Sequence, residues 1–465
     1  MKKTVIVFAL GLGVSASAPA ADLMEVLQRS KSSDPQLAAA WHQRQAAQEV
    51  KKQALSAFLP QINGTAGRSR TQTDLTFGQF GNIPVPDSER EFWQVALQQS
   101  IYDQGAIENY RLAKLQTALA AAEYDAAYQD FLLRVAQAYF GVLNAEDSLR
   151  FAKAELKAMK RQWDQAEQRF KVGLAAVTDV HEAKASYDAA HARVIVAENT
   201  LEDAREALYE VAQEYYIDLQ RPPEELTVSE TSLPSLKAKE ETALAKNPNL
   251  GQARISAEMA EKTVKLRRAG HLPTLGLSYS HNNSTQFDTA VRDPDPNSPT
   301  YQEIIALVDQ DTVNRNVSLN LSVPLYTGGR VSSQTRQARK EYEAAMNRME
   351  QAERNTVRQV RSAWYGLKAA ISGLEARKQA VTSAKSALEA TQAGYEVGTR
   401  TIVDVLIAQR GLYQAQRDYA KAKYDYLQQV LGLERAAGTL DDEDVRNINR
   451  LLTETVPPHN DETQG

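Results

Sequence analysis

Residue types that commonly carry chemistry are sparse in this chain of 465 residues. It contains no cysteine, which excludes disulfides, thiolate metal sites and cysteine nucleophiles. Its six histidines form no H-x-x-x-H pair, and His181 and His191 stand ten residues apart. No P-loop, G-x-S-x-G or dinucleotide-binding motif occurs. We therefore expect no enzymatic activity, no catalytic residue, no bound metal and no cofactor.

Two aspartates draw attention by their spacing. Asp179 and Asp404 each follow a glycine by six residues, within two copies of the segment V-G-x-x-x-[VI]-x-D-V that contain Gly173 and Gly398. The glycines permit the backbone to reverse, and an acidic side chain suits the first turn of the returning helix. The simplest interpretation is that both aspartates cap helices. Any further role depends on the elements that position them.

Long helices are expected to carry these turns. No proline interrupts residues 106–172 or 330–397, and at about 1.5 Å per residue each stretch would run to roughly 100 Å. Beyond each turn, large residues alternate with alanine at steps of three and four: Val180, Ala183, Tyr187, Ala190 and Val194 in one, and Val405, Ala408, Leu412, Ala415 and Tyr419 in the other. This heptad pattern predicts left-handed coiled coils. A buried helix face alone does not explain the large–small alternation.

Strands are predicted at four places, with an apolar and a polar residue alternating best at 93–101, 275–280 and 317–325 and more weakly at 62–75. Polar stretches at about 77–89 and 282–312 are expected to be loops. The alternation is typical of a barrel wall with a lipid-facing side, although a soluble sheet with one solvated face would also show it. The smallest membrane barrels have about eight strands, so several chains must share one barrel if these strands span; three chains would supply twelve.

The chain is an internal duplication. Five pairs of segments match in the same order: 34–37 with 247–250, 59–60 with 272–273, 101–102 with 325–326, 135–142 with 360–367, and 170–180 with 395–405. We predict a first repeat at 21–232, a second at 233–440, and a C-terminal segment at 441–465 whose end is disordered. Each repeat should read helix, strand, strand, long helices.

The N-terminus has the pattern of an export signal. Lys2 and Lys3 precede an apolar run and the sequence Ala18-Pro19-Ala20, which predicts a signal peptide at 1–20. The mean hydropathy of −0.48 argues against a helical membrane protein. The formal charge of −5 gives no support to nucleic-acid binding.

Taken together, these segments resemble the TolC family of outer-membrane efflux and secretion channels. The most specific one is YEVGTRTIVDVL at 395–406, with RFKVGLAAVTDV at 169–180 as its partner; 271–274, 324–329 and 437–440 also fit. The resemblance covers about 22–440. It implies a mainly α fold with a small β part. Three chains would share a 12-stranded outer-membrane β-barrel, continued into the periplasm by an α-helical barrel of coiled coils with a mixed equatorial region.

The resemblance also implies a function. Family members form the passive exit duct of tripartite efflux pumps and type I secretion systems, exporting drugs, toxins or polypeptides. The expected partners are two further copies of the chain, outer-membrane lipid, a periplasmic adaptor (membrane fusion) protein, and an inner-membrane RND or ABC transporter. A soluble periplasmic adaptor or scaffold is the alternative. It would share the signal and the heptads but would not need four amphipathic strands, and cell fractionation distinguishes the two.

The family assigns roles to several residues at the turns. Tyr395 and Arg400 match positions that tie neighbouring coils together at a closed tip, and Asp179 matches their partner. Asp404 matches an aspartate that forms a ring at the constriction, where the mutual repulsion of the carboxylates must be offset by cations or protons. The resemblance further implies that docking of a transporter and an adaptor opens this tip.

Two further expectations concern the same region. The grooves around Gly173 and Gly398 match the surface on which the adaptor docks. Ile407 departs from the family pattern, because a second inward aspartate is expected at this position. The ring of negative charge should therefore be thinner, and the mouth partly a hydrophobic gate.

Overall fold

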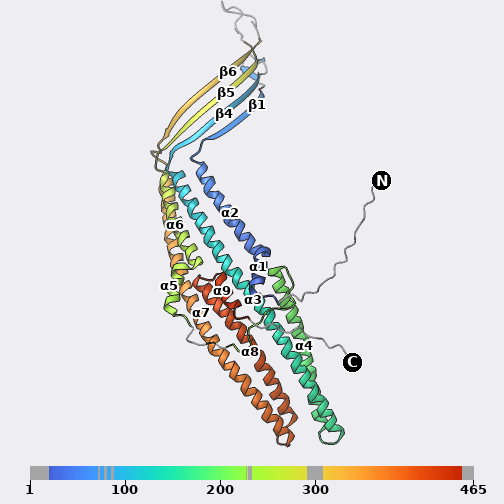
Figure 1. The fold of residues 1–465 in the computed structure, drawn as a ribbon. Helices are drawn as coiled ribbons and strands as arrows, with labels where there is room; N and C mark the ends of the chain where they lie inside the picture. Colours follow the sequence, from blue (N-terminus) through green and yellow to red (C-terminus); the bar gives the residue numbers. More distant parts are fainter. Residues whose placement is uncertain are drawn as a thin grey trace, which may run out of the picture. The chain divides into compact units, whose positions relative to one another are not determined.

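The computed structural model describes residues 20–71, 74–77, 81–84, 88–226, 228, 233–290 and 307–452 (Figure 1). Its helices are α1 (Leu23–Ser33), α2 (Pro35–Ser56), α3 (Gln104–Lys171), α4 (Val177–Ala212), α5 (Leu236–Lys246), α6 (Pro248–Ala269), α7 (Arg330–Glu396), α8 (Ile402–Ala437) and α9 (Asp442–Asn449). Its strands are β1 (Gln61–Thr71), β2 (Asp74–Phe77), β3 (Gly81–Pro84), β4 (Ser88–Asp103), β5 (Thr274–Ala290) and β6 (Leu307–Ser322). The prediction of a mainly α fold with a small β part is confirmed.

The element order repeats along the chain. The series α1, α2, β1, β4, α3, α4 returns as α5, α6, β5, β6, α7, α8. Equivalent helices have nearly equal lengths: 11 residues for α1 and α5, 22 for α2 and α6, 68 and 67 for α3 and α7, and 36 for α4 and α8. The two proline-free stretches fold as α3 and α7. Their lengths follow from the absence of any residue that removes a helical hydrogen bond.

The described chain divides into two compact units that cut across the repeats. One comprises Met1–His42, Ala122–Gly251 and Glu350–Gly465, and the other comprises Gln43–Ala121 and Gln252–Met349. Each unit therefore contains parts of both repeats.

The second unit contains an antiparallel sheet with strand order β1-β4-β5-β6 (Figure 1). Directly paired residues share a face, so the register places Ile62, Leu97, Tyr279 and Val317 in one row. Together with Val95, Leu277, Leu319 and Leu321 they form what we term the apolar face of the sheet. Much of it is exposed, with 69% of Val317 accessible. The opposite face presents serine, asparagine and glutamine side chains.

The strands differ from the predicted pattern at their far ends. β5 continues to Ala290 and β6 begins at Leu307, although 282–312 was predicted to be a loop. The hairpin of β2 and β3 occupies part of the loop predicted at 77–89. In the outer parts of β5 and β6 most residues on both faces are polar, so the alternation that marks a strand is lost while backbone pairing continues. β2 and β3 have only four residues each, which is too short for the alternation to be recognised. The prediction of a sheet of four strands in each chain is confirmed, and the separate hairpin of β2 and β3 is an addition to it.

The first unit is built from two antiparallel hairpins, α3 with α4 and α7 with α8 (Figure 1). Its main core gathers fully buried aromatic side chains from α3 and α8, among them Tyr139, Phe140 and Tyr424. The rings of Phe140 and Tyr424 stack with centroids 6.1 Å apart. The end of α8 and the short helices α1 and α9 pack on the same core.

Within the described ranges, no helix combines the length and the apolar character needed to cross a bilayer. The predicted signal peptide, except its last residue, lies outside the described residues. So do residues 453–465, which include the end of the C-terminal segment that was predicted to be disordered, from Pro457 to Gly465.

Candidate gate at the helix turns

Each hairpin reverses through the same backbone motif. After α3, Gly173 has φ +75° and its N–H donates to the carbonyl of Phe170, while the N–H of Leu174 reaches back to Arg169. After α7, Gly398 has φ +79° and its N–H donates to the carbonyl of Tyr395. The second bond of that turn joins the N–H of Thr399 to the carbonyl of Gly394. These pairs define Schellman motifs, in which the residue with positive φ is glycine because a Cβ would clash.

The helices that leave the two turns begin differently. Thr401 is the N-cap of α8, and its hydroxyl accepts from the N–H of Asp404 at 3.3 Å. The Asp404 carboxylate in turn accepts from the N–H of Thr401 at 3.0 Å, completing a capping box. In α4 the N-cap is Ala176, which offers no side-chain oxygen. Asp179 occupies the position equivalent to Asp404 but has no capping partner.

The electrostatics of Asp404 follow from this cap. Hydrogen bonds from the backbone and hydroxyl of Thr401 lower the pKa of the Asp404 carboxyl below its ordinary value, with a smaller contribution from the charge of Arg400. Its helix-capping role, predicted for both aspartates, is therefore confirmed for Asp404 only. Ile407, one turn further along α8, is 60% exposed.

Arginine side chains lie at different places in the two turns. Arg169, in the last turn of α3, places its guanidinium carbon 4.8 Å from the centre of the Tyr395 ring on α7, within the range of a cation–π contact. The repeat alignment puts Gly394 at the position of Arg169. A Cβ added at Gly394 would lie 2.8 Å from Cγ of Arg400, so the glycine leaves room for the Arg400 side chain to fold over the turn.

A small apolar core holds the two hairpins together just behind the turns. Its fully buried members are Met159, Ala166, Ala183, Ala190, Ile402 and Leu406. They come from α3, α4 and α8, and Tyr395 of α7 packs against them. Alanine at the predicted seam positions lets these helices approach closely.

A buried ion triad lies further along the same hairpins. The carboxylate of Glu155 on α3 accepts from Arg193 of α4 at 2.7 Å and from Arg417 of α8 at 2.9 Å. Only 1% of the Glu155 side chain is exposed. The triad thus joins three helices from both hairpins through one carboxylate.

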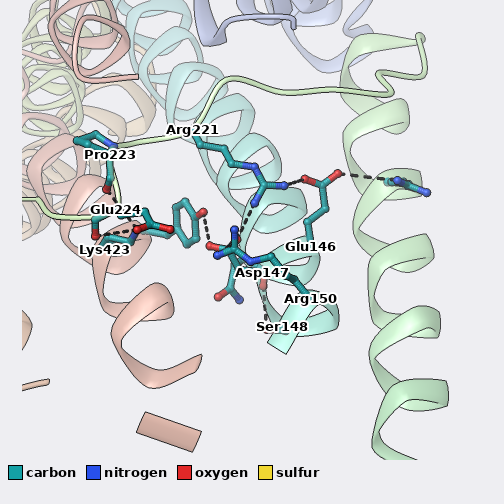
Figure 2. Close-up of polar contacts among 11 residues, drawn as sticks. Glu146, Asp147, Ser148, Arg150, Arg221, Pro223, Glu224 and Lys423 are labelled. Atoms are coloured by element: carbon teal, nitrogen blue, oxygen red, sulfur yellow. Dashed lines mark hydrogen bonds and ion pairs between the residues drawn. The ribbon is translucent and has the colours of Figure 1, made fainter. Parts of the chain in front are cut away.

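A second ionic network fixes the segment that follows α4 (Figure 2). Arg221 pairs with Glu146 and donates to Asp147 at 2.6 Å, and the hydroxyl of Tyr424 donates to the other oxygen of Asp147 at 2.8 Å. Lys423 donates to the backbone carbonyl of Pro223 at 3.3 Å. Burial raises the pKa of Glu146 although Arg221 opposes the shift. The network connects α3, α8 and the segment around Arg221.

The structure brings some of the predicted residues together and leaves others apart. Tyr395 contacts Arg169 of α3 and packs against the small apolar core behind the turns. Among the described residues of the single chain, neither Asp179 nor Arg400 has an ion-pair partner, and no cluster of three potential metal ligands occurs. Arg169 and the Glu155 triad were not found from the sequence. The repeat alignment contained a signal for the Glu155 triad. The position equivalent to Glu155 in the second repeat is Ala380, so the charge occurs in one repeat only.

Comparison with known proteins identifies the class. The model of the family described as outer membrane efflux protein matches residues 26–212 and 241–439. The outer membrane protein TolC of Vibrio cholerae serotype O1 is 38% identical, over 97% of this chain and 99% of its own length. The alkaline protease secretion protein AprF of Pseudomonas aeruginosa is 29% identical, over 92% of this chain and 86% of its own. A solved structure of CusC matches with a TM-score of 0.72 at 17% identity, covering 90% of this chain and 92% of that one.

The paired strands, duplicated coiled coils and reversing turns are thus those of an outer-membrane channel protein. The chain belongs to the outer membrane efflux protein family, which includes TolC. It lies in the outer membrane and acts as an exit duct of efflux and secretion systems.

Proposed function

We propose that three copies of this chain assemble into one channel, with their β1-β4-β5-β6 sheets joined into a 12-stranded barrel. Four strands are too few to close a barrel, and in lipid every backbone polar group must be paired. Among the described strands of the sheet, β1 and β6 each have a partner on one side only. The exposed apolar face would contact lipid, and the polar face would line the lumen.

The gate is proposed to be the ring of helix turns. Asp179 would pair with Arg400 and Tyr395 of a neighbouring coil, since neither charged group is neutralised within the described chain. This asymmetry between the two turns is the observation that carries the proposal. Asp404 would stay in its capping box, and the Asp404 side chains of the three chains would form the ring at the constriction. Ile407 would add a ring of apolar side chains one helical turn away.

The channel is proposed to be passive and to open when partners dock on the turns. A periplasmic adaptor would occupy the grooves around Gly173 and Gly398, and an RND or ABC transporter would supply the cargo from the inner membrane. The Glu146 and Asp147 network would act as a fixed base from which the hairpins move. Support comes from its burial and from the number of elements that it connects.

Single-channel recording in planar bilayers tests the gate. We expect Arg400→Gln and Tyr395→Phe to raise the conductance of the purified trimer, because each removes a partner of the closed turn. Lys171→Gln is the matched control: Lys171 is an exposed cation at the end of α3 that pairs with Glu167 of the same helix at 3.5 Å. Unchanged conductance in Arg400→Gln would refute the latch, whatever the effect of the other variants.

A further inference from the structure

The apolar face of the sheet ends in three polar or amphipathic side chains. On β5 the apolar run from Leu275 to Tyr279 is followed by His281, and on β6 the run from Leu321 to Val317 is followed by Arg315. On β4 the last apolar side chain before the glutamates is Trp93. His281 and Arg315 lie near the middle of β5 and β6, and Trp93 lies in the half of β4 that is farther along the chain from α3. All three follow the end of the apolar run that points away from the helices in the chain. In the barrel proposed above, this end of the apolar run would face the cell exterior.

The three side chains contact one another. Nε of Arg315 donates to Nδ1 of His281 at 3.3 Å. The indole of Trp93 lies beside the imidazole, with ring centroids 5.0 Å apart and ring planes at 36°. Because Nδ1 accepts this bond, the neutral imidazole carries its proton on Nε2. The cluster therefore presents the Nη groups of Arg315 and one imidazole N–H.

Arg315 also differs from Arg68 and Arg70, the two arginines of β1 on this face, of which Arg70 pairs with Glu89 at 3.8 Å. Arg68 is neutralised by Glu89 at 2.5 Å and Glu91 at 3.1 Å. For Arg315, no carboxylate partner occurs within the described part of the chain. An arginine on a lipid-facing strand is destabilising unless it reaches the interface or an anion, by about 2–4 kcal/mol at the bilayer midplane. Its position therefore calls for a negatively charged group supplied from outside the protein.

A surface hollow adjoins the cluster. It measures about 530 Å³ and is lined on this face by Ala66, Arg68, Glu91, Trp93, Asn283 and Thr285. The Glu91 carboxylate is paired with Arg68 at 3.1 Å. Trp93 forms part of the hollow and also touches His281, so the hollow and the Arg315–His281 pair are continuous. The small side chain of Ala66 leaves space beside the indole in which a sugar ring could lie.

We propose that this cluster binds lipopolysaccharide of the outer leaflet, with a lipid A phosphate on Arg315 and His281 and the attached sugar against Trp93. A guanidinium can hold a phosphate through two parallel hydrogen bonds, which an ammonium cannot reproduce. Tryptophan is enriched at the level of lipid headgroups. The assignment rests on the membrane-spanning barrel proposed above.

Native mass spectrometry of the detergent-purified trimer tests the site. The protein is incubated with diphosphoryl lipid A, with lipid A lacking phosphates, and with phosphatidylglycerol. We expect retention of diphosphoryl lipid A to fall about tenfold in Arg315→Gln, the loss of charge-assisted hydrogen bonds. Arg315→Lys should retain an intermediate amount. Arg90→Gln is the control, because Arg90 is an exposed arginine of the same sheet on the opposite face.

The outcomes separate the possibilities. Equal retention by the native protein and Arg315→Gln overturns the site, as does binding that is independent of the phosphates. Equal binding of phosphatidylglycerol, lost in the same variant, overturns lipopolysaccharide as the ligand. Trimer mass and bilayer conductance are recorded for every variant, so failure of the proposed channel would be seen separately as loss of the trimer or of its conductance.

Discussion

At the residue scale, the N-cap positions of α4 and α8 separate the roles of two equivalent aspartates. Thr401 caps α8 and forms hydrogen bonds with Asp404, whereas Ala176 has no side-chain oxygen and leaves Asp179 without a capping hydrogen bond. Ala176 already has the extended backbone that an N-cap needs, with φ −80° and ψ 156°. A hydroxyl introduced there should therefore bring Asp179 into a capping box.

We predict that Ala176→Thr stabilises the first turn of α4 by about 1 kcal/mol. Amide hydrogen exchange in residues 177–180 should slow about fivefold, as that free energy requires. Conductance should rise at the same time, because the new cap draws Asp179 away from its proposed latch partner. Thr401→Ala is the reciprocal variant and should speed exchange at the start of α8. Faster or unaltered exchange in Ala176→Thr would contradict the capping argument.

A pH dependence follows from Glu146. Its carboxyl has a raised pKa because it is buried, so the folded protein binds this proton more tightly than the unfolded chain does. The contribution of Glu146 to stability must then fall as pH rises from the ordinary glutamate pKa through the raised one, and must grow on acidification.

We predict that native protein gains stability relative to Glu146→Gln when the pH is lowered from 7 toward 5. Denaturant midpoints of both proteins at a series of pH values provide the measurement. Arg205 lies 3.8 Å from Glu146 and pairs with the exposed carboxylate of Glu202 at 3.0 Å. Glu202→Gln is therefore the control and should show no such trend. A difference that grows with rising pH would show that the sign of the shift is wrong.

At the element scale, the Glu155 triad couples the two hairpins. Glu155→Gln would leave Arg193 and Arg417 without a carboxylate in a mostly buried site. Removing one partner of a fully buried pair costs about 3–5 kcal/mol. Because a quarter to a third of the arginine side chains remains exposed, we predict a loss of about 2 kcal/mol, measured by denaturant unfolding of the trimer.

The chain offers a matched control for this loss. Lys153 and Glu198 also join α3 to α4, at 3.3 Å, but about half of each side chain is exposed. Glu198→Gln should therefore cost less than about 1 kcal/mol. Similar losses in the two variants would mean that the triad does not couple the hairpins more strongly than an ordinary surface pair.

The same elements show what the sequence could predict. Proline-free runs located α3 and α7 to within about two residues, and two-residue alternation located the strands where one face is apolar. The hairpin of β2 and β3 was missed because each strand has only four residues. The outer ends of β5 and β6 were missed because mostly polar residues on both faces give no periodic signal. The Glu155 triad was missed because it depends on three helices meeting, which local pattern does not encode.

At the scale of the whole molecule, the duplication sets both the architecture and its exceptions. The equal lengths of paired helices allow two unlike hairpins to occupy similar places around a shared axis in the proposed trimer. The differences between repeats then fall on charged residues: Arg169 against Gly394, Arg400 against Ala175, and Glu155 against Ala380. We propose that residues 21–232 and 233–440 are the two repeats. What the repeats share forms a common scaffold, and the charged residues in which they differ form the gate.

The open edges of the sheet give the final prediction. If β6 of one protomer pairs with β1 of the next, residues on the polar face of both strands must come within disulfide reach in one register. Because the chain has no cysteine, introduced cysteine pairs can be tested without interference from native thiols.

Asn63→Cys on β1 is combined in turn with cysteine at Asn314, Asn316 and Ser318 on β6. After oxidation, one combination should give a covalent trimer on denaturing gels, whereas its neighbours, shifted by two residues, should react poorly. Each single-cysteine variant should stay monomeric. Since Asn63 and Asn314 are separated within a chain by β4 and β5, crosslinks that appear only within single chains, or in no register, would refute the shared barrel.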